Sequence, residues 1–157
     1  MRRILIIVAL ALAIIVATVI LIKESTKKEE FVSVKVFFNN TKLDPEISCN
    51  KVFPVKRSVS KAGKVKEETL TELLGGPTAS EVSEGFFTLI NSGVKLKKLS
   101  ISGNTATADF DERLEVPGGS CWVSAVKAQI TQTLKQFPGI ENVIISINGR
   151  TEDILQP

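Results

Sequence analysis

The chain of 157 residues contains no histidine and no tyrosine. Histidine is the commonest general base in enzymes and the commonest side-chain metal ligand, so its absence removes the usual acid–base catalyst and the usual metal site. The two cysteines cannot build a structural zinc site without histidine partners. A cysteine nucleophile would also lack its activating base. We therefore expect no enzymatic activity, no metal and no cofactor.

The chain also lacks a large charge of either sign. Its 20 lysines and arginines oppose 17 acidic residues, and without Arg2 and Arg3 the balance is 18 against 17, or +1. A nucleic-acid-binding domain normally carries a clear basic excess on one face. The one cluster of cations lies between Lys51 and Lys66, where Phe53 is the only aromatic residue. We therefore expect no nucleic-acid partner.

Charge is wholly missing from one segment near the N-terminus. From Ile4 to Ile22 the chain has 19 residues that are all apolar except Thr18. A helix of this length measures about 28 Å, close to the thickness of the hydrocarbon core of a bilayer. We therefore predict that residues 1–22 form a transmembrane helix that contacts membrane lipid through the run from Ile4 to Ile22.

A cleaved signal peptide is one alternative, because Arg2 and Arg3 supply its basic start, and a buried soluble helix is another. The run exceeds the usual apolar core of about 7–15 residues, and its best cleavage position, near Ala17, is followed by more apolar residues. The short N-terminal tail favours a cytoplasmic N-terminus. We expect a single-pass protein of the cell membrane whose C-terminal domain is extracytoplasmic.

The rest of the chain divides into a charged linker over residues 23–30, one domain over residues 31–150 and a C-terminal tail over residues 151–157. Apolar periodicity and turn residues predict the element order β-β-α-β-β-α-β for the domain. Each element has one apolar face, so we expect an α+β fold in which helices cover one face of a two-layer mixed sheet. The expected strands are 31–38, 52–59, 94–101, 105–110 and 143–147, and the expected helices are 66–74 and 121–137, with Ser120 as the N-cap of the second.

Cys49 and Cys121 are the only cysteines, and they lie in one domain. In an oxidising exterior such a pair is read as a disulfide, and closing a loop of about 72 residues contributes roughly 4 kcal/mol in the chain-entropy model. Two alternatives stay open from the sequence alone. Both thiols can be free and buried, or Cys121 can be a reactive thiolate, since it opens a helix.

The domain resembles the GerMN domain family of spore germination and sporulation proteins. The resemblance rests on five stretches in order: Val34–Phe38 as an opening strand, Leu70–Thr78 as a helix ending in Gly-Gly-Pro-Thr, Ala106–Phe110 as the second strand of a hairpin, Gln129–Gly139 as the end of the long helix, and Val143–Gly149 as the last strand. It covers nearly all of residues 31–150.

Membership implies a bacterial, envelope-facing protein with a fold similar to the ring-building modules of secretion and sporulation complexes. It implies no catalytic residue, because the family has no established one. The chain departs from related lipoproteins in lacking a lipid-accepting cysteine after the apolar run. It has Asn91-Ser92-Gly93 where the family usually has Pro-Gly.

We therefore expect a non-catalytic module for protein–protein association, either with an unknown envelope protein or with itself. The alternative is a domain that binds peptidoglycan or another cell-wall glycan. A third reading, a wall hydrolase, rests on the carboxylates of Asp109 and Asp111, whose i, i+2 spacing on a strand resembles that of paired catalytic acids. Candidate contact residues for a partner or glycan are Lys56, Arg57, Lys95, Lys97, Lys98 and Trp122.

Overall fold

The computed structural model describes residues 12, 14–16, 18, 29–115 and 118–156. The chain divides into two compact units, Met1–Glu30 and Phe31–Pro157. The described residues before Glu29 are helical. No helix within the described part of the chain is both long and apolar enough to cross a membrane. The predicted membrane helix and charged linker fall largely outside the described residues, so both stay predictions.

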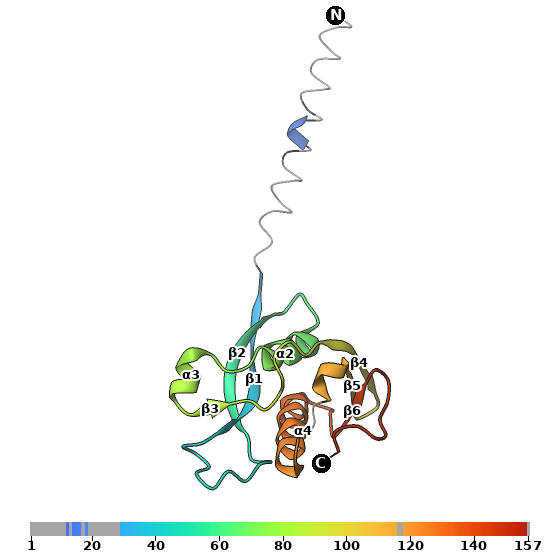
Figure 1. Cartoon of the computed structure of the whole chain (residues 1–157). Coiled ribbons are helices and arrows are strands. Elements are labelled where there is room, and N and C mark those ends of the chain that lie inside the picture. The colour runs from blue at the N-terminus through green and yellow to red at the C-terminus, as the bar shows by residue number, and fades with distance from the viewer. Residues whose placement is uncertain (1–11, 13, 17, 19–28, 116–117, 157) are drawn as a thin grey trace, which may run out of the picture. The chain divides into compact units, whose positions relative to one another are not determined.

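The second unit opens with an antiparallel sheet of strand order β2-β1-β3 (Figure 1). β1 (Phe31–Asn40) and β2 (Phe53–Ser60) pair along their length, and alternate β1 side chains are buried, as a half-buried strand requires. β3 (Phe86–Phe87) pairs with Asn39 and Asn40. The strand was expected to end at residue 38. It instead continues through Asn39 and Asn40, because β3 pairs with their backbone, and both side chains are buried.

A second sheet has the strand order β4-β5-β6. β4 (Leu96–Ser102) and β5 (Thr105–Phe110) form the predicted hairpin, whose tight turn contains Gly103 at φ +57°. β6 (Asn142–Ile147) runs parallel to β5. A parallel partner needs a long crossover, which here consists of the short 3₁₀ turn η1 (Glu112–Leu114) and helix α4 (Ser120–Lys135).

Three α-helices lie in the described part of this unit. α2 (Val65–Leu74) is followed by Gly76, whose positive φ of 76° ends the helix. α3 (Ala79–Ser83) begins with a capping box formed by Thr78 and Glu81. The long helix α4 was expected to have Ser120 as its N-cap, which is wrong: Gly119 is the N-cap and Ser120 is the first helical residue.

The α+β class is confirmed, but the strands form two three-stranded sheets where one mixed sheet was predicted. The end of α4 explains the separation. Gln136 accepts a hydrogen bond from the Lys35 N–H at 2.7 Å and donates one to the Lys35 carbonyl, while Thr133 Oγ1 accepts from the Phe37 N–H at 3.2 Å. These side chains occupy the edge of β1 that another strand would need, so the first sheet cannot continue into the second.

The helices join the two sheets into one core. α4 contacts β1 and β6, and α2 contacts β1, β2 and β4 (Figure 1). Val126, Ile130 and Leu134 on α4 are fully buried. The C-terminal segment adds Ile154 and Leu155 to the same buried cluster.

Candidate functional site

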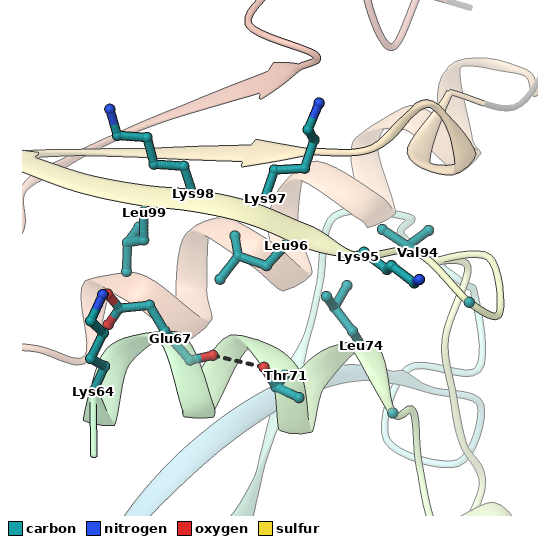
Figure 2. A pocket seen from close by; sticks show the side chains of 12 residues that line it. Lys64, Glu67, Thr71, Leu74, Val94, Lys95, Leu96, Lys97, Lys98 and Leu99 are labelled. Atoms are coloured by element: carbon teal, nitrogen blue, oxygen red, sulfur yellow. Dashed lines mark hydrogen bonds and ion pairs between the residues drawn. The ribbon is translucent and has the colours of Figure 1, made fainter. Parts of the chain in front are cut away.

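An open groove of about 810 Å³ lies between α2 and β4. Figure 2 shows Leu96 and Leu99 of β4 pointing toward α2 and Leu74 of α2 pointing toward β4, so the groove has an apolar floor. Lys64 lies near one end and Lys95 near the other (Figure 2). The groove is therefore elongated and apolar at its centre, with a cation at each end.

A β-bulge explains why Leu96 and Leu99 share one face of β4. The pairing with β5 shifts by one residue, since Leu96 lies opposite Phe110 and Lys98 lies opposite Asp109. One extra residue in β4 interrupts the alternation of side chains. Lys97 and Lys98 border the groove, but their side chains point away from α2 (Figure 2). Of the three candidate contact lysines in this segment, Lys95, Lys97 and Lys98, only Lys95 is left on the groove side.

The charges along the rim are weakly paired. Lys64 Nζ lies 3.8 Å from Glu67 Oε1, and the Lys64 side chain is 82 % exposed, so water screens this pair. The Thr71 hydroxyl is engaged within α2, where it donates to the Glu67 carbonyl at 3.0 Å. Lys95 donates its backbone N–H to Asp111, and its ammonium group makes no hydrogen bond or ion pair with the described residues. The rim thus presents cationic groups that are weakly paired or unpaired among the described residues.

The paired carboxylates that suggested a hydrolase are occupied by structural bonds. Asp109 Oδ1 accepts hydrogen bonds from the Ser146 hydroxyl and the Gly149 N–H, both at 2.7 Å. Burial acts to raise the pKa of Asp109, but these bonds and two nearby lysines of β4 hold it below its ordinary value. Asp111 Oδ1 accepts from the Lys95 N–H at 3.1 Å. Both side chains therefore fix turns and strand ends.

Arg57, a predicted contact residue, is held inside the fold. Its guanidinium forms a two-pronged pair with Glu81, with Nη2 2.7 Å from Oε2, and its side chain is 12 % exposed. These hydrogen bonds raise the pKa of Arg57 and lower that of Glu81. Lys56, the residue before it, points to the opposite face and is exposed. We therefore leave Arg57 out of any contact surface.

The predicted disulfide between Cys49 and Cys121 is confirmed, with a Cα–Cα distance of 5.0 Å. It joins the loop before β2 to the first turn of α4 and leaves no free cysteine for redox chemistry. Trp122, the next residue, is half-buried and packs against the core. A Cβ at Gly118 would lie 2.8 Å from its ring, so the indole also covers this loop. Trp122 is therefore mainly a packing group.

Sequence reasoning missed a buried polar network around Gln129. Gln129 is a polar residue of α4, yet it is fully buried. It donates to Asn39 Oδ1 at 2.9 Å and accepts from the Thr88 hydroxyl at 2.8 Å. Asn39 in turn donates to the carbonyls of Cys49 and Lys51. The signal was present, because Gln129 lies three residues after a buried valine and one before a buried isoleucine, on the apolar face.

Within residues 29–115 and 118–156 no group of three or more acidic, cysteine or histidine side chains is arranged to hold a metal ion. The groove thus offers apolar contact and cationic ends.

Comparison with known proteins places the chain in a family. The family model described as "Germane: Sporulation and spore germination" matches residues 35–153. No curated protein matches. The tandem GerMN domains of the sporulation protein GerM from Bacillus subtilis align at 22 % identity and a TM-score of 0.57, covering 80 % of this chain and 41 % of that one. The chain thus spans about two fifths of the tandem structure.

Two further structures have the same fold. The first GerMN domain of Bacillus subtilis GerM aligns at 22 % identity and a TM-score of 0.53, covering 76 % of this chain and 85 % of that one. A putative lipoprotein from Clostridium perfringens aligns at 14 % identity and a TM-score of 0.52, covering 82 % and 84 %. At these identities the likeness establishes the fold alone.

Fold and family match together define a single α+β domain of the GerMN type. The chain belongs to the Germane family of sporulation and spore germination domains, which confirms the resemblance seen in the sequence. The family's description names a biological process and no enzyme class.

Proposed function

We propose that this chain is a membrane-anchored protein of the bacterial cell envelope whose extracytoplasmic domain binds another protein through the α2–β4 groove and catalyses no reaction. The groove is the observation that carries this proposal. Its floor of Leu74, Leu96 and Leu99 is apolar, and Lys64 and Lys95 flank it. The same domain engages its candidate catalytic carboxylates in structural hydrogen bonds.

The compartment is supported by two independent features. The run from Ile4 to Ile22 is long enough to span a bilayer. The Cys49–Cys121 disulfide suits an oxidising exterior, where such bonds persist. Together they favour a domain held outside the cytosol next to the membrane.

The groove suits a segment that carries apolar side chains at its centre and acidic side chains at its ends. Burying one leucine-sized side chain contributes about 1.5–3 kcal/mol, and complementary rim charges add orientation and association rate more than affinity. Ordering the segment offsets part of this gain. A modest affinity is enough, because attachment to the membrane raises the local concentration of both partners.

A photo-crosslinking amino acid at position 71 of the full-length chain, in the native membrane, tests the groove. We expect a discrete crosslinked product at Thr71, and none at Ser100, an exposed control on β4. The double variant Lys64→Glu/Lys95→Glu should remove the product without changing the amount of protein. Equal crosslinking at positions 71 and 100, or no effect of the charge reversal, would contradict the proposal. Co-sedimentation with purified peptidoglycan in the absence of groove crosslinks would favour the cell-wall alternative.

A further inference from the structure

The outer face of the first sheet carries an unusual pair of charges. Lys35 on β1 lies directly opposite Lys56 on β2, and both are exposed. Like charges at directly opposed positions destabilise a sheet. Neither ammonium group has a hydrogen bond or ion pair with the described residues. The neighbouring pair on this face, Ser33 and Ser58, brings no acidic group to neutralise them.

Aromatic side chains flank the two lysines along β1. Phe31 shares the outer face and is 59 % exposed, and Phe37, two residues beyond Lys35, is half-buried. Core-facing residues of β1 alternate with these outward-facing residues, because successive side chains of a strand point to opposite faces of the sheet. Lysine side chains can reach lipid headgroups while phenylalanine rings beside them contact the outer edge of the acyl chains. We call this surface, made of Phe31, Ser33, Lys35, Phe37, Lys56 and Ser58, the β1–β2 outer face.

Chain length sets an upper limit on the distance between this face and the proposed anchor. Phe31 follows Ile22 by nine residues, and nine residues span at most about 30 Å when fully extended. Lys35 lies four residues further, or about 14 Å along the strand. We propose that the β1–β2 outer face rests on anionic lipid headgroups of the membrane that holds the anchor. This inference depends on the anchoring put forward under the proposed function.

The expected contact is weak and depends on the tether. Each lysine near an anionic surface strengthens binding about fivefold, so the pair contributes about 25-fold. A free domain would bind little at this strength, but a short tether keeps the face at high local concentration beside the lipid. The contact also gives a physical role to a charge pair that weakens the sheet.

The test uses the full-length chain in nanodiscs of neutral lipid or of neutral lipid mixed with phosphatidylglycerol. A fluorophore on Ser58→Cys, with the native disulfide intact, reports quenching by a lipid that carries a spin label on its headgroup. Ser100→Cys on the second sheet is the matched control. We expect stronger quenching at position 58 than at position 100 in anionic discs, and a loss of the difference in neutral discs. Sodium chloride at about 0.5 M should reduce it, since screening is then effective within about 4 Å.

Variants of two lysine pairs distinguish a contact of the β1–β2 outer face from a non-specific attraction of the whole domain to anionic lipid. Lys35→Gln/Lys56→Gln should lower the equilibrium between contacting and free domain by about 25-fold, whereas Lys97→Gln/Lys98→Gln should leave it unchanged. If the chain does not elute with the discs at all, the anchoring and this inference fail together. If it elutes with them but quenching at position 58 is the same in both lipids, the inference fails and the anchoring stands.

Discussion

The side-chain amide of Gln129 donates a hydrogen bond to Oδ1 of Asn39 at 2.9 Å in the interior of the domain. Ninety residues separate the two in the chain. The bond links the middle of α4 to the end of β1, and Asn39 passes the link to the loop that carries Cys49. The disulfide and this amide network therefore fix the same loop from two sides.

Replacing Gln129 by leucine should destabilise the domain. Leucine is similar in size to glutamine but leaves Asn39 Oδ1 buried without its donor. This lowers the free energy of unfolding by about 1–3 kcal/mol. Gln132→Leu, on an exposed position of the same helix, should change the free energy of unfolding by less than about 0.5 kcal/mol. Urea unfolding followed by the fluorescence of Trp122 measures both. Equal effects of the two variants would show that the buried amide is not needed.

Removing the disulfide should lower the free energy of unfolding by more than the Gln129→Leu substitution does. Cys49→Ser/Cys121→Ser should lower the free energy of unfolding by up to about 4 kcal/mol, because the unfolded chain is no longer closed into a loop of 72 residues. The same unfolding assay under reducing conditions should give the wild-type chain a similar loss. Thiol titration of the denatured, unreduced protein should find none, and two titratable thiols would contradict the bridge.

The Arg57–Glu81 pair should make the domain sensitive to acid. Hydrogen bonds from Arg57 lower the pKa of Glu81 below its usual 4.5, so the folded state holds its proton less tightly than the unfolded state. The stabilisation is therefore complete above about pH 4.5 and is lost as the pH falls through the folded pKa. Glu81→Gln should reduce this part of the pH dependence, and Glu84→Gln, an exposed carboxylate beside α3, should not. Identical pH profiles for wild type and Glu81→Gln would contradict the pair.

Charge reversal at Lys56 and at Lys98 should change the stability of the domain in opposite directions. Lys56→Glu replaces a like-charge pair with an attractive one and should stabilise the sheet by about 0.5 kcal/mol. Lys98→Glu should destabilise by a similar amount, since Lys98 lies opposite Asp109. Thermal unfolding of the two variants measures the difference. Destabilisation by Lys56→Glu would show that Lys35 and Lys56 do not repel each other.

Local patterns predicted most elements but not how they are joined. Alternating apolar residues identified β1, β4 and β5, a short apolar run identified β6, and the 3.6-residue period identified α2 and α4. The division into two sheets depends on Gln136 and Thr133 reaching the edge of β1 about a hundred residues away in sequence. No local pattern encodes that contact.

The candidate site was predicted only in part. The disulfide was predicted because the domain has two cysteines and was expected to lie in an oxidising exterior, and the structure confirms the bond. Lys95, Lys97 and Lys98 were all predicted as contact residues, but the bulge at Leu96 turns Lys97 and Lys98 away from Lys95. A bulge adds one residue to one strand, so alternation cannot be extended across it. The groove itself required the position of α2 against β4, which the sequence does not specify.

Protease treatment of intact protoplasts that express the full-length chain tests the central claim most directly. The account predicts that the chain sediments with membranes, that external protease removes residues 31–157, and that the domain carries the Cys49–Cys121 disulfide before digestion. A chain that stays in the soluble cytosolic fraction, resists the protease until the cells are lysed and presents two reduced thiols would contradict it.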